Sequence, residues 1–149
     1  MSPGAHLRAS LWSLAAFLGM GMWLEAMFGL RVAGVLDDPL RREFLRLGHA
    51  HGGLLALANL GIGWALERLQ TPPGWATRVR LASWLGALLV GLGFVGGGLW
   101  HGPADPGPLV LLVPAGALML VTSLVATAMV RPGDAARRQS GDSNPGNAS

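Results

Sequence analysis

Four ionisable side chains in this sequence could carry chemistry: Glu25, His49, His51 and His101. Glu25 lies within a long apolar stretch, where an ionisable group is costly and usually faces other helices or a water-filled cavity. It could donate or accept a proton, or it could be a protonated acid that hydrogen-bonds a neighbouring helix. We therefore take Glu25 as the candidate catalytic residue.

The three histidines are candidate ligands for haem or a metal, because imidazole is the commonest metal ligand in proteins. His49 and His51 are two residues apart, so on a regular helix their side chains diverge by about 200°. They cannot face one ligand unless the helix begins between them. His101 directly follows another apolar stretch and could also be an ordinary residue that faces water.

Soft donors lie near Glu25 in the form of Met20, Met22 and Met27. Thioether and imidazole together suit Cu(I), although methionine is also an ordinary filler of apolar packing. Copper is therefore a weaker prediction than haem. The absence of cysteine excludes thiol catalysis, disulfides and cysteine-ligated metals.

Four apolar stretches must position these side chains, at residues 11–30, 49–66, 81–100 and 109–130. Each approaches the roughly 20 residues that a helix needs to cross a bilayer. Charged residues make up 13% of the chain, against roughly a quarter in soluble domains. Because lipid satisfies no backbone polar group, the sequence predicts an all-α integral membrane four-helix bundle over residues 1–131.

The crossing order brings the end of the first span, the start of the second and the end of the third to one side. Glu25 and the three histidines are thus expected in one polar layer. Arginines on the other side are more numerous, seven (8, 68, 78, 80, 131, 137 and 138) against four (31, 41, 42 and 46). By the positive-inside rule we expect both termini to be cytoplasmic and the layer to lie near the outer face. Arginine in place of all lysine suggests a GC-rich bacterial genome, hence the bacterial inner (plasma) membrane.

The connections contain clear helix signals. Asp38 can cap a helix with Pro39 at its first position, and residues 40–47 then separate an apolar from a basic face. We predict a short interfacial helix there, before the second span. Residues 71–74 and 102–108 are rich in Pro and Gly, so we expect them to be loops that separate the spans. The polar tail at 132–149 is predicted to be disordered.

Small residues favour close helix packing within the spans. Gly93 and Gly97 form a small-xxx-small pair in the third span, which is the main packing device where lipid removes the hydrophobic drive. Asn59 in the second span is predicted to hydrogen-bond another helix. Pro114 is expected to kink the fourth span.

Several function classes lack support. The arginines flank hydrophobic spans and form no basic stripe, so we expect no nucleic-acid partner. The sequence has no G-x-S-x-G, no H-E-x-x-H and no phosphate-binding loop, and four spans with one buried acid do not suggest a secondary transporter.

Residues 48–61 (GHAHGGLLALANLG) resemble the haem-ligating second helix of heme-copper oxidase subunit I. They are also similar to small bacterial four-helix membrane proteins that look like detached parts of that subunit. The resemblance implies His51 or His49 as an axial haem ligand, with His101 as a second one. Four spans cannot supply the copper site of the large subunit, so oxygen reduction by this chain alone is not expected.

In size, span number and the histidine that opens the second span, the chain also resembles hydroxylaminobenzene mutase, a small membrane enzyme. Glu25 or a histidine would then be the general acid that protonates an arylhydroxylamine.

Three hypotheses stay open on the sequence alone. The protein could bind haem or a metal at the His/Glu layer, or it could be an enzyme for a small aromatic substrate. It could also be a non-catalytic subunit or scaffold that packs on another membrane protein or on a second copy.

Overall fold

The computed structural model describes residues 1–34 and 37–130, and the regular structure in this part of the chain is entirely helical. Helix α1 spans Pro3–Gly29, α2 spans Pro39–Arg68 and α3 spans Pro73–Leu99. A 3-10 turn, η1 (Pro108–Leu111), leads into α4 (Leu112–Ala128). The predicted disordered tail at 132–149 lies outside the described residues.

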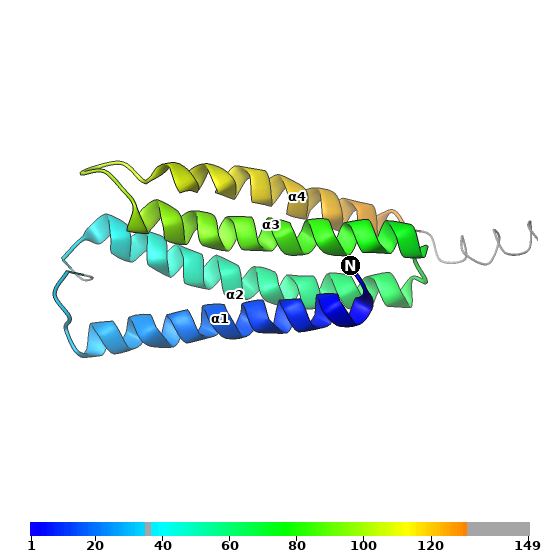
Figure 1. Ribbon diagram of the computed structural model, residues 1–149, viewed down its shortest axis with the longest axis horizontal. Coiled ribbons are helices and arrows are strands. Elements are labelled where there is room, and N and C mark those ends of the chain that lie inside the picture. Colours follow the sequence, from blue (N-terminus) through cyan, green and yellow to red (C-terminus); the bar gives the residue numbers. More distant parts are fainter. Residues whose placement is uncertain (35–36, 131–149) are drawn as a thin grey trace, which may run out of the picture.

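The helices lie side by side in chain order, so that each packs mainly on its neighbour in the sequence (Figure 1). Within the described residues α1 and α4 do not pack on each other, so the bundle is an open row. We call the end with the connections after α1 and after α3 the loop end. The opposite end, with the N-terminus, the link from α2 to α3 and the end of α4, is the terminal end (Figure 1).

Local signals start the first two helices. Ser2 accepts a hydrogen bond from the backbone N–H of Ala5 at 3.3 Å, and Pro3 follows at the first helical position. In the same way Asp38 accepts from the N–H of Arg41 at 3.0 Å, and Pro39 follows. Both caps satisfy backbone donors that have no partner inside the helix.

The predicted interfacial helix does begin at Pro39, but it does not end before the second span. It continues without a break to Arg68 as one helix of 30 residues. No proline interrupts the junction, and Gly48 packs there so closely on α3 that an added Cβ would lie 3.2 Å from the backbone of Val95. Tertiary packing therefore holds the two predicted pieces in one continuous helix.

Pro114 is the third residue of α4, so it lies in the first helical turn and not in the middle of a span. The backbone N–H groups of a first turn have no partner within the helix, and proline is tolerated there without a kink. The irregularity that the structure shows near Pro114 is the 3-10 turn that precedes the helix, and the predicted kink itself stays a prediction.

Glycines set the distances between the helices. Gly86 of α3 and Gly116 of α4 face each other, and a Cβ on either would come within 2.8 Å of the other's carbonyl oxygen. Gly93 would meet the backbone of Val113 at 3.1 Å, and Gly97 would meet the ring of Phe44 at 3.2 Å. Gly93 and Gly97 thus lie at the contacts of α3 with α4 and α2.

Among the described residues, three segments are long and apolar enough to cross a membrane, namely α1, α3 and residues 108–128. Helix α2 is long enough but less apolar, because its central part contains His49, His51 and Asn59. Large apolar side chains on the outside of the row are exposed, including Trp12, Met22 and Leu118. This surface suits contact with lipid chains.

Candidate functional site

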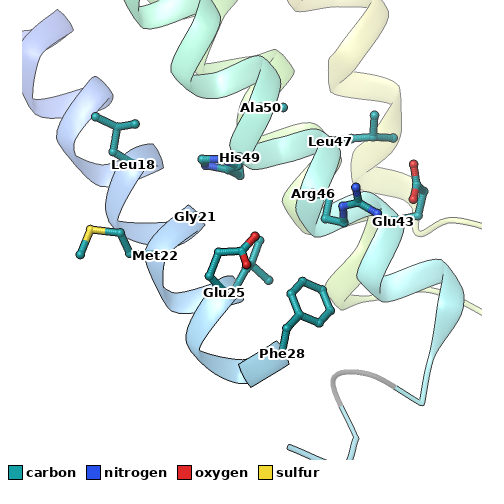
Figure 2. Close-up of a pocket in the computed structure, with 11 residues that line it drawn as sticks. Leu18, Gly21, Met22, Glu25, Phe28, Glu43, Arg46, Leu47, His49 and Ala50 are labelled. Atoms are coloured by element: carbon teal, nitrogen blue, oxygen red, sulfur yellow. The ribbon is translucent and has the colours of Figure 1, made fainter. Parts of the chain in front are cut away.

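A cleft of about 780 Å³ lies between α1 and α2 at the loop end (Figure 2). This α1–α2 cleft contains two of the four residues singled out from the sequence, Glu25 and His49. Its charged rim on α2 adds Glu43 and Arg46. The remaining lining is apolar apart from backbone: Leu18, Gly21, Met22, Leu24, Phe28, Leu47 and Ala50.

Glu25 and His49 approach the cleft from opposite helices. Figure 2 shows the Glu25 carboxyl group of α1 pointing into the space beside α2, while the His49 ring reaches from α2 toward α1. Glu25 is exposed in the isolated chain, and His49 is half-buried. The structure therefore brings an acid and an imidazole to one cleft.

The His49 ring is held by the backbone of α1. Its Nδ1 lies 2.7 Å from the carbonyl oxygen of Phe17, and the ring lies over Gly21, where a Cβ would come within 2.7 Å of Nε2. Glycine at position 21 leaves the preceding turn uncovered, so this carbonyl can accept a second hydrogen bond. The contact fits the tautomer with a proton on Nδ1, which leaves a lone pair on Nε2.

His51 faces a different helix. Its Nδ1 lies 3.0 Å from the Leu47 carbonyl of its own helix, and its ring lies 5.0 Å from the ring of Phe94 on α3. His49 and His51 thus point to opposite sides of α2, as their spacing predicts.

His101 forms a third, separate contact at the loop end. Its Nε2 lies 2.7 Å from Oδ2 of Asp38, the residue that caps α2. The hydrogen bond from the Arg41 N–H, reinforced by His101, holds the pKa of Asp38 below its ordinary value. His101 therefore fastens the connection after α3 to the start of α2.

The expected single polar layer is thus divided among three places. Glu25 and His49 share the cleft, His51 packs between α2 and α3, and His101 pairs with Asp38. In residues 1–34 and 37–130 no three His, Asp or Glu side chains are grouped so that they could hold a metal ion.

Two of the three methionines of the copper hypothesis, Met20 and Met22, also line different grooves. Met22 borders the α1–α2 cleft, but Figure 2 shows its side chain pointing away from α2. Met20 lines a different, apolar groove between α1 and α3.

A second polar layer, at the terminal end, was missed by the sequence analysis. His6 is 2% exposed, and its Nε2 lies 2.9 Å from the carbonyl oxygen of Asn59. The Asn59 amide donates to the carbonyl of Leu55 at 3.0 Å and, across the interface, to that of Ser83 at 3.3 Å. The predicted interhelical role of Asn59 is present in the structure, and the layer joins α1, α2 and α3.

The feature that marks this layer in the structure is a glycine that faces a histidine on the neighbouring helix. The His6 ring lies over Gly63, where a Cβ would come within 2.8 Å of Cδ2. Gly63 follows Asn59 by four residues, as Gly21 follows Phe17. In both places the glycine uncovers the carbonyl that the histidine contacts, but the pairing of residues this far apart is not visible in a local pattern.

No family model, curated protein or solved structure matches this chain. The candidate site must therefore be interpreted from its own geometry.

Proposed function

We propose that the protein is a small integral membrane protein that binds haem in the α1–α2 cleft through His49. One observation carries this proposal: Nδ1 of His49 is held by the Phe17 carbonyl, and the ring lines a cleft. Histidines that ligate metals commonly donate their other ring N–H to a backbone carbonyl, which fixes the ring and strengthens the ligand nitrogen. His49 fits this pattern through Nε2.

The cleft suits a large, flat, mainly apolar molecule with acidic groups. Its volume of about 780 Å³ lies within the roughly 300–1,000 Å³ of small-molecule sites. Apolar side chains such as Leu18 and Phe28 line it, and Arg46 stands at its rim. Arg46 could pair with the carboxylates of haem, and Glu25 could take up a proton beside the bound group.

We also propose that α2 crosses the membrane together with the other three helices. Residues 47–66 contain no charged side chain, and 20 helical residues extend about 30 Å, the thickness of the hydrocarbon core. The arginine distribution supports cytoplasmic termini in a bacterial inner membrane, with the cleft near the outer face.

The test is an absorption spectrum of the protein purified in mild detergent from cells supplied with haem. We expect a Soret band that His49→Gln abolishes, since glutamine keeps an N–H donor for the Phe17 carbonyl but does not ligate iron. The matched variants His51→Gln and His101→Gln should keep the band. A wild-type protein without a Soret band, or a band unchanged in His49→Gln, would contradict the proposal.

A second candidate function is catalysis on a small aromatic substrate, because Glu25 and His49 line the same cleft. Glu25 would then supply a proton to a group such as the hydroxylamine oxygen, with His49 as its partner in acid-base chemistry. Turnover of an arylhydroxylamine by the purified protein should fall about 100-fold or more in Glu25→Gln. Glu43→Gln, at the rim of the same cleft, is the control, and full activity of Glu25→Gln would exclude this function.

A further inference from the structure

A second cleft, of about 310 Å³, lies at the terminal end where α2 meets α3. Its walls include Glu67 near the end of α2, Thr71 in the link, and Pro73 and Arg80 of α3. We call it the Arg80 cleft. It is far along the bundle from the α1–α2 cleft and shares no lining residue with it.

Arg80 is buried in the wall of this cleft without a full set of acceptors. The residue is 5% exposed, and its Nε has no hydrogen-bond partner among the described residues. It forms an ion pair with Glu67, at 3.9 Å between Nη2 and Oε1, which is too long for a hydrogen bond. The Glu67 side chain is 58% exposed, so much of its charge is solvated. A buried guanidinium with such weak compensation favours a further anionic partner.

Two other features of the Arg80 cleft point to an anion. The hydroxyl of Thr71 is buried and has no partner in the described part of the chain. The N-terminus of α3, where Pro73 lines the cleft, has no side-chain cap and no acidic residue in its first turn, so the helix dipole adds a partial positive charge there. A guanidinium and a hydroxyl provide donors for a tetrahedral oxyanion, and the positive end of the helix dipole favours its charge.

The surroundings suit a position at the level of lipid headgroups. Arg68 lies over the ring of Trp64, and Arg78 lies over the ring of Trp75, each at 5.7 Å. Tryptophan and arginine at helix ends are typical of the membrane interface. The geometry points to a phosphate-binding site in the Arg80 cleft, which takes the phosphate of an anionic lipid or free inorganic phosphate.

The experiment measures thermal unfolding of the full-length protein in mild detergent with added phosphatidylglycerol, phosphatidylcholine or inorganic phosphate. Wild-type protein should be stabilised by phosphatidylglycerol at much lower concentrations than by phosphatidylcholine. Arg80→Gln should weaken this effect about tenfold or more, because a charge-assisted hydrogen bond is lost. Arg78→Gln removes the same charge from the same helix outside the cleft, and it should retain most of the effect.

Two further variants keep the test decisive if Arg80→Gln does not fold. Glu67→Gln removes the competing carboxylate, so it should bind phosphatidylglycerol several-fold more tightly. Thr71→Val should weaken binding. Stabilisation by inorganic phosphate alone would identify a free anion as the ligand, and its failure beside a phosphatidylglycerol effect would identify the lipid headgroup. Equal losses in Arg80→Gln and Arg78→Gln, or no gain in Glu67→Gln, would overturn the site.

Discussion

The α1–α2 interface contains the same contact twice, once near each end. At the terminal end His6 of α1 lies over Gly63 of α2, and at the loop end His49 of α2 lies over Gly21 of α1. Each ring contacts the carbonyl of the residue four positions before that glycine. In the first contact α1 supplies the histidine and α2 the glycine, and in the second contact the reverse holds.

The surroundings of the two rings differ. His6 is almost fully buried beside Asn59, which is 0% exposed. His49 is half-buried and forms the wall of a cleft that also contains Glu25. A hydrogen bond between helices therefore does not by itself distinguish a packing histidine from a ligand-binding one. The two rings differ instead in exposure and in the size of the cleft that they border: His6 is 2% exposed beside a cleft of about 300 Å³, whereas His49 is half-buried beside one of about 780 Å³.

The strongest test of this comparison places leucine at the two glycines. Gly63→Leu should destabilise the protein by about 1–3 kcal/mol, because it would displace the His6 ring, which is 2% exposed, and break its buried hydrogen bond to the Asn59 carbonyl. Gly21→Leu should cost less, since the His49 ring can swing into the cleft. Unfolding in denaturant after reconstitution in detergent would measure both.

The controls for this test lie two residues before each glycine. A Cβ at Gly61 or at Gly19 would meet nothing within 4 Å. Leucine at either position should be neutral, or stabilising by up to about 1 kcal/mol through helix propensity. Equal costs at Gly63 and Gly21 would show that the two histidine contacts are equally rigid and would break the comparison.

A smaller effect is expected from Asn59→Leu at the terminal end. The change removes the hydrogen bond to the Ser83 carbonyl and should cost about 0.5–1.5 kcal/mol of stability. It should leave ligand binding in the α1–α2 cleft unchanged, because Asn59 does not line that cleft. Parallel stability and binding assays check this, and weakened binding would mean that the two ends are coupled.

The smallest effect concerns pH at the loop end. Because the pKa of Asp38 is lowered by the Arg41 N–H and by His101, its contribution to stability is present above its ordinary value of 3.8 and is lost as the pH falls further. Asp38→Asn keeps a capping oxygen but removes the charge. We therefore expect the acid-induced fall in melting temperature to be smaller in this variant than in the wild type, and identical pH profiles would contradict the role of the pair.

Much of the helical framework could be predicted from the sequence. The starts of α1 and α2 follow from a capping side chain and a proline, and the breaks near 71–74 and 102–108 follow from proline and glycine. Three of the four predicted spans are long and apolar enough in the structure to cross a membrane. These features depend on residues within a few positions of one another, so local physics is sufficient.

The candidate site could be predicted less completely. The sequence identified Glu25 and His49, but it did not separate them from His51 and His101, and it overlooked His6 and Arg80. Which neighbour a helical side chain meets depends on how each helix is rotated about its axis and on which glycines face it. Those quantities are set by contacts between residues far apart in the chain, such as His6 with Asn59 and His49 with Phe17.

The sequence by itself thus determined an all-helical chain with apolar, membrane-compatible segments and the places where its helices begin. The tertiary structure alone decided that residues 39–68 form one helix, that His49 and not His101 joins Glu25 at a cleft, and that Arg80 is buried. The physical reason is that helix formation is governed by short-range hydrogen bonds and hydropathy. The surroundings of a side chain are governed by close packing between helices, which no single segment contains.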